Sequence, residues 1–101
     1  MPSDESSLER VKAVLPGVEH RRMMGEYLLY KDGRLFGGIY DDRLMLKITK
    51  ATARIDEWPS DFPYEGGGEM VLVPEPYDAK LIAKVVEEML SELPEPKKKK
   101  R

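Results

Sequence analysis

Four cationic residues near the middle of the chain have the spacing to form a binding patch. They are Arg21, Arg22, Arg43 and Lys47. Their side chains donate hydrogen bonds to phosphates and carboxylates, so together they would contact an anion or an acidic partner. The expected strand order brings Arg22, Arg43 and Lys47 near one another. The alternative is a solvated face whose cations pair with local Asp and Glu, worth about 0–1 kcal/mol a pair.

A second cationic group ends the chain and consists of Lys97, Lys98, Lys99, Lys100 and Arg101. The net charge of the whole chain is −2, so setting aside the +5 of this run leaves −7 for residues 1–96. An acidic body repels nucleic acid, so nucleic-acid binding would depend on this tail or on a local basic patch. Two other interpretations are a nuclear import signal and a disordered, solubilising end.

Residue types that carry catalysis or bind metals are sparse. His20 is the only histidine and the chain has no cysteine, so we expect no transition-metal site. Asp41 and Asp42 could offer carboxylates to Ca²⁺ or Mg²⁺, but two adjacent aspartates are also typical of a turn. The glycines at 66–68 precede a predicted strand, whereas a phosphate-binding loop leads into a helix. We therefore expect no metal, no cofactor and no enzymatic activity.

The elements that would position these residues alternate between helices and blocks of strands. Ser6 and Glu9 form a capping-box pattern for a helix over 6–15, and Asp78 precedes a strongly amphipathic helix over 79–93. Between them we expect strands over 22–31, 34–40 and 43–49, a short helix over 50–57 capped by Thr49, an edge segment over 62–64 and a strand over 69–73. Asp32-Gly33 predicts a two-residue hairpin turn, and Asp41-Asp42 predicts a second one.

The resulting order, helix–three strands–helix–two strands–helix, predicts an α+β fold. We expect a two-layer sandwich with a mainly antiparallel sheet and helices on one face. Alternation along 43–49 points Leu44, Leu46 and Ile48 toward the helices and Arg43, Met45, Lys47 and Thr49 away from them. The other face stays open for contact, and its apolar candidates are Met23, Tyr27, Phe36, Tyr40 and Met45.

Three motifs resemble a known family. The runs Arg-Arg-Met-Met-Gly at 21–25, Leu-Tyr-Lys-Asp-Gly-Arg-Leu-Phe at 29–36 and Asp-Asp-Arg-Leu-Met-Leu-Lys at 41–47 are similar to the signature of the TfoX amino-terminal domain family (TfoX/Sxy). The similarity extends over residues 5–93. It implies a two-layer fold similar to type III secretion chaperones. It also implies an association with the regulation of natural competence, in which full-length members act as transcriptional coactivators.

Together these observations predict a non-enzymatic regulatory or protein-interaction domain over 1–96, followed by the basic tail at 97–101. We expect a protein partner or self-association through the open sheet face. The alternative is a nucleic-acid-associated protein that uses the tail with Arg21, Arg22 and Arg43. No segment is apolar enough to span a membrane, and the acidic amino terminus does not predict a signal peptide, so we expect a cytoplasmic protein.

Overall fold

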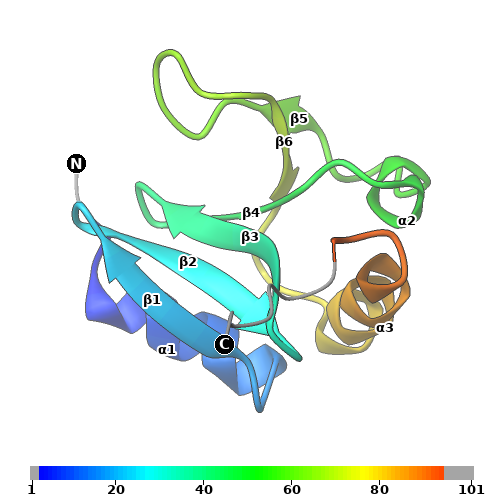
Figure 1. The fold of residues 1–101 in the computed structure, drawn as a ribbon, viewed down its shortest axis with the longest axis horizontal. Helices are drawn as coiled ribbons and strands as arrows, with labels where there is room; N and C mark the ends of the chain where they lie inside the picture. The colour runs from blue at the N-terminus through cyan, green and yellow to red at the C-terminus, as the bar shows by residue number, and fades with distance from the viewer. Residues whose placement is uncertain (1–2, 95–101) are drawn as a thin grey trace, which may run out of the picture.

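The computed structural model describes residues 3–94 as three helices and six strands (Figure 1). The helices are α1 (Glu5–Val14), α2 (Lys50–Ala53) and α3 (Ala79–Leu90). The strands are β1 (Glu19–Met23), β2 (Glu26–Lys31), β3 (Arg34–Tyr40), β4 (Arg43–Leu46), β5 (Ser60–Asp61) and β6 (Met70–Val73). The basic run at 97–101 and the domain boundary expected at 96 lie outside the described residues.

One antiparallel sheet contains all six strands, in the order β1-β2-β3-β4-β6-β5. The predicted α+β fold is therefore confirmed, but the sheet has six strands rather than five. The segment expected as one strand over 22–31 is two strands, joined by a turn in which Met24 and Gly25 have φ of 53° and 85°. Methionine rarely adopts positive φ, so the sequence signals this turn only through Gly25.

The helices α1 and α3 pack on one face of the sheet and enclose the core with it (Figure 1). Leu44 and Leu46 are fully buried in this core, as their alternation predicted. The prediction for Ile48 was wrong, because β4 ends at Leu46 and the chain then leaves the sheet for α2. The buried centre of the core consists of Val11, Leu29, Phe36, Ile39, Leu44, Leu46, Ile82, Val85, Val86 and Met89.

Two of the three predicted helix starts are confirmed by their hydrogen bonds. The Asp78 carboxylate accepts from the Leu81 amide, and Thr49 forms a capping box with Thr52. The predicted capping box at Ser6 was wrong. Helix α1 instead begins after Asp4, whose side chain makes no capping bond.

Two helices are shorter than predicted, and another side chain binds one end of each. The Glu92 carboxylate accepts from the amides of Lys50 and Ala51, which ties the start of α2 to the chain after α3. Helix α2 ends at Ala53 rather than 57. Helix α3 ends at Leu90 rather than 93, where the Arg34 guanidinium donates to the Leu90 carbonyl at 2.6 Å. The predicted edge segment over 62–64 was also wrong, because the edge strand is Ser60–Asp61.

Both predicted hairpin turns form, with positive φ at each central residue. Asp32 and Gly33 have φ of 53° and 78°, and Asp41 and Asp42 have φ of 54° and 63°. The second turn has no glycine, but hydrogen bonds to residues near the start of the chain stabilise it. The Asp42 carboxylate accepts from the Asp4 amide at 2.8 Å and from the Ser7 hydroxyl at 2.6 Å, and the Asp42 amide donates to the hydroxyl of Ser3.

Candidate interaction surface on the open sheet face

The face of the sheet turned away from the helices presents two rows of side chains. Residues directly opposite each other on neighbouring antiparallel strands share a face. The pairings Arg21↔Leu28, Leu28↔Gly38, Gly38↔Met45 and Met45↔Leu72 therefore define one row across five strands. The next row contains Met23 opposite Glu26, and Tyr40 opposite Arg43. We call this surface the open face.

Three of the five apolar residues predicted for the open face are on it: Met23, Tyr40 and Met45. The predictions for Tyr27 and Phe36 were wrong, since both are buried in the core beneath the helices. Tyr27 pairs with Ile39, which points into the core. Phe36 points inward because the register of β2 and β3 shifts between Leu29 and Tyr30, leaving Phe36 as the extra residue of a bulge.

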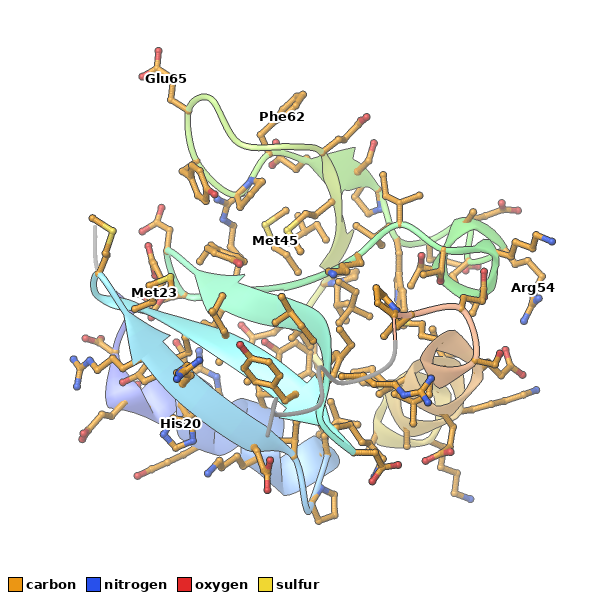
Figure 2. All side chains as sticks on the ribbon, in the orientation of Figure 1. His20, Met23, Met45, Arg54, Phe62 and Glu65 are labelled. Carbon is orange, nitrogen blue, oxygen red and sulfur yellow. The ribbon has the colours of Figure 1, made fainter. Side chains whose placement is uncertain are left out.

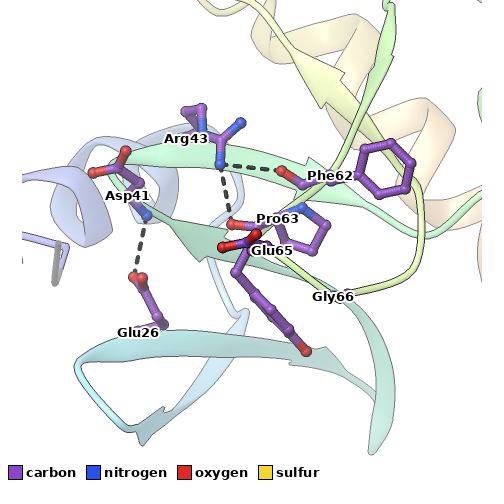
Figure 3. A pocket seen from close by; sticks show the side chains of 9 residues that line it. Glu26, Asp41, Arg43, Phe62, Pro63, Glu65 and Gly66 are labelled. Atoms are coloured by element: carbon purple, nitrogen blue, oxygen red, sulfur yellow. Dashed lines mark hydrogen bonds between the residues drawn. The ribbon is translucent and has the colours of Figure 1, made fainter.

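The loop from Phe62 to Glu69, between β5 and β6, covers part of the open face. Arg43 holds it there, with its guanidinium donating to the Asp61 carboxylate at 3.2 Å. The same guanidinium donates to the carbonyls of Phe62 and Pro63 at 3.3 and 3.1 Å (Figure 3). Met45 is fully buried although it points away from the helices. The loop and the neighbouring side chains of the open face therefore shield Met45 from water. The part of the open face over β1 and β2 is not covered.

Glycines let two tyrosines lie close to the backbone on this face. A Cβ at Gly38 would come within 2.7 Å of the Tyr40 ring, and one at Gly67 within 2.8 Å of the Tyr64 ring. The two rings meet each other at a centroid distance of 5.9 Å and an angle of 56°. Tyr64 therefore joins the loop to the strand residue Tyr40.

Three depressions in this surface share Tyr64 as a common wall. The largest, about 660 Å³, lies between the loop and the strand ends and is lined by Glu26, Asp41, Arg43 and residues 62–67 (Figure 3). The second, about 440 Å³, is lined by Met23, Met24, Glu26, Leu28, Tyr40 and Tyr64. The third, about 370 Å³, is lined by Tyr40, Lys47, Ile48, Pro63, Tyr64, Gly68, Glu69 and Met70. We call the three together the open-face groove.

The large exposed hydrophobic residues of the described chain all line this groove. Met24 is 96% exposed, and the other four are 51–59% exposed. The set consists of Met23, Met24, Ile48, Phe62 and Tyr64. Figure 2 shows Phe62 projecting outward from the loop. Single exposed hydrophobics are common on proteins, but a contiguous group marks a contact site.

Carboxylates gather at one end of the groove. Glu26, Asp41 and Glu65 line the largest depression, and Glu65 projects from the loop in Figure 2. The Oε1 atom of Glu26 accepts from the Ser3 hydroxyl and from the Asp41 amide. Burial, followed by the electrostatic effects of Tyr64, Glu26 and Tyr30, raises the pKa of Tyr40 above its ordinary value.

The structure does not bring the four predicted cations into one patch. Strands β2 and β3 separate Arg21 and Arg22 from Arg43. The Arg22 guanidinium lies over the Tyr27 ring at 5.5 Å, on the helix side of β1. Arg43 is engaged with the loop, and Lys47 lines the smallest depression. A role for these residues, or for the tail, in binding anions or nucleic acid stays a prediction.

The other candidate residues have structural contacts. His20 packs edge-on against Tyr27 at 5.8 Å. The hydrogen bond from Ser7, and then that from the Asp4 amide, lower the pKa of Asp42. Within residues 3–94, no three His, Asp or Glu side chains are grouped so as to hold a metal ion. No helix of that region is long and apolar enough to cross a membrane.

Comparison with known proteins identifies the chain by family. The sequence model of the TfoX N-terminal domain matches residues 9–80, so the chain belongs to that family. Searches of curated proteins and of solved structures found no match. The implied likeness to type III secretion chaperones therefore stays a prediction. The matched region spans β1 to β6, including every residue that lines the open-face groove.

Sequence analysis missed the residues that shape the groove from the loop. Phe62 and Tyr64 were assigned to an edge segment, and Glu65 to no element, with no part in a site. The sequence nevertheless contained a signal for these residues. Two aromatic residues beside a run of glycines are unusual in a loop, because a loop has no strand or helix to bury them.

Proposed function

We propose that this TfoX N-terminal domain is a non-enzymatic regulatory domain that binds another protein through the open-face groove. One observation carries the proposal: the large exposed hydrophobic residues of the described chain all gather along this one groove. Burying them against a partner contributes about 25 cal/mol for each Å² of apolar surface removed from water. Residues such as Met and Tyr suit adaptable contact surfaces of this kind.

Family membership supports a more specific role in regulation. The resemblance of the motifs at 21–25, 29–36 and 41–47 to those of TfoX proteins is the basis for proposing a part in competence and transcription regulation. In bacteria the chromosome lies in the cytoplasm, so a role in bacterial competence and transcription regulation includes a cytoplasmic location. The domain would act by contact with another protein, and the groove would supply that contact.

The test compares proteins captured by the tagged full chain in its own cells. The double variant Phe62→Ser/Tyr64→Ser removes two exposed aromatics from the groove, and Lys84→Ser is the matched control on the exposed side of α3. We expect a partner that the wild type and the control retain and that the double variant loses. Equal thermal unfolding of the three proteins would show that the fold is intact. Identical captured proteins for all three would overturn the proposal.

A further inference from the structure

We infer that the open-face groove accepts a segment of a partner protein that combines arginine or lysine with apolar residues. This inference rests on the proposed function and specifies the chemistry of the partner. The apolar requirement comes from the groove walls, where Met23, Met24 and Leu28 face Tyr64 across one depression. The cationic requirement comes from the carboxylates at the adjoining end.

The charge at that end is not neutralised within the described residues. Asp41 and Glu65 form no ion pair there, and Glu26 engages only Oε1, which leaves Oε2 without a hydrogen bond from residues 3–94. Among residues 3–94, Arg43 is the one cation lining this depression, and its guanidinium is engaged with Asp61 and two loop carbonyls. A ligand cation would therefore meet unpaired carboxylates beside the aromatic ring of Tyr64.

A second copy of the chain fits this surface poorly. Placing two grooves face to face with their carboxylate ends together would set Glu26, Asp41 and Glu65 against the same carboxylates of the copy. Pairing two copies antiparallel along the exposed edge strand β1, in the register centred on Arg21, would place Arg21 opposite Arg21 of the copy. Like charges directly opposite each other destabilise a strand pair. Both arrangements are disfavoured by charge.

The basic run of the chain itself also lacks part of the required chemistry. Residues 97–101 supply five cations but no aliphatic or aromatic side chain that could fill the apolar depression. A partner segment that combines cationic with apolar residues supplies both. Its apolar residues would contact Met24 and Tyr64, and its cations would contact Asp41 and Glu65.

The experiment uses the full chain and two short synthetic peptides. One combines arginine with leucine and phenylalanine, and the other has glutamate in place of each arginine. Binding is measured by fluorescence anisotropy at low and high salt, and amide chemical shifts locate the site. We expect the arginine peptide to bind with shifts at Met24, Leu28 and Tyr64, and to weaken as salt rises. The glutamate peptide should not bind.

Two double variants that remove the same charge separate the contribution of the groove carboxylates to binding from that of the apolar surface. Asp41→Asn/Glu65→Gln removes two groove carboxylates, and asparagine tolerates the positive φ at 41. Glu9→Gln/Glu57→Gln removes the same charge from exposed positions outside the groove. We expect the first variant to bind the arginine peptide about fivefold more weakly, with a smaller salt dependence, and the second to bind like the wild type.

Several results would overturn the inference. Equal binding of both peptides in the groove would leave the proposed function standing but remove the charge requirement. Binding of neither peptide, or shifts outside the groove, would also refute it. A concentration-dependent dimer with shifts at Tyr64 would identify a second copy as the occupant. Tighter peptide binding after removal of 97–101 would identify the basic run as the occupant.

Discussion

On the helix side of the sheet, α1 and α3 cover the strands with aliphatic side chains, and the central residues there are fully buried. On the open side, a loop held mainly by one arginine covers Met45 and leaves the β1–β2 side bare. Apolar packing with the helices therefore stabilises one face of the sheet. On the other face, hydrogen bonds from Arg43 hold the loop in place. The difference teaches that the helix side supplies stability and the open side is available for contact.

Truncating a core residue on the helix side should give the largest effect. We expect Leu44→Ala to lower the free energy of unfolding by about 2–5 kcal/mol, since it leaves a cavity between the sheet and the helices. Urea denaturation measures this change. Met24→Ala, on the open face, is the matched control and should shift the free energy by about 0.5 kcal/mol or less. Similar losses for both variants would contradict the division between the faces.

Removing the arginine that holds the loop should have an intermediate effect. Arg43→Gln leaves the carbonyls of Phe62 and Pro63 without their donor, so we expect a loss of about 1–3 kcal/mol. Hydrogen exchange should become faster in the loop and in β6, but not in α3. The control Arg43→Lys keeps the charge near Asp61 but cannot reach several acceptors at once, so it should restore only part of the protection. Unchanged exchange in Arg43→Gln would show that the loop is held by other contacts.

Replacing the exposed aromatics should cost little stability. Phe62→Ser/Tyr64→Ser removes the ring contact with Tyr40, for which we expect about 1 kcal/mol or less. The measurement is the midpoint of urea unfolding. A loss as large as that of Leu44→Ala would mean that these residues belong to a core, and the contact surface would have to be abandoned.

The smallest change concerns the pH dependence of the turn at 41–42. Because hydrogen bonds lower the pKa of Asp42 in the folded state, its carboxylate stabilises the protein above the ordinary value of 3.8. That stability is lost as the pH falls through the lower folded pKa. We expect wild type to exceed Asp42→Asn in stability at neutral pH and the gap to close in strong acid. A gap that stays constant over the titration would exclude this linkage.

The sequence predicted those parts of the fold that depend on local signals. Asp32-Gly33 and Asp78 each specify a turn or a cap within a few residues, and both predictions were confirmed. The turn at Met24-Gly25 carries a weaker local signal, so two strands were merged into one. The inward position of Phe36 depends on the register of a neighbouring strand, which no pattern within β3 reveals.

The candidate site was less predictable than the fold for the same reason. Arg43 was identified as a contact residue, but its guanidinium reaches a loop about twenty residues further along the chain, where Phe62 and Pro63 offer carbonyls. The position of Tyr64 depends on that distant tether. No short sequence motif marks a groove that is formed by contacts between residues far apart in the chain. The alternation of Leu44 and Leu46, by contrast, is visible directly in the sequence.

The Asp41-Asp42 turn has a consequence for the order of folding. Its two left-handed aspartates lack a glycine's freedom, and the hydrogen-bond partners of Asp42, which are Ser3, Asp4 and Ser7, lie 35 to 39 residues earlier in the chain. Closing so long a segment is slow compared with forming a local hairpin. The β3–β4 hairpin therefore gains full stability only when α1 docks, so the two should appear in a single kinetic step.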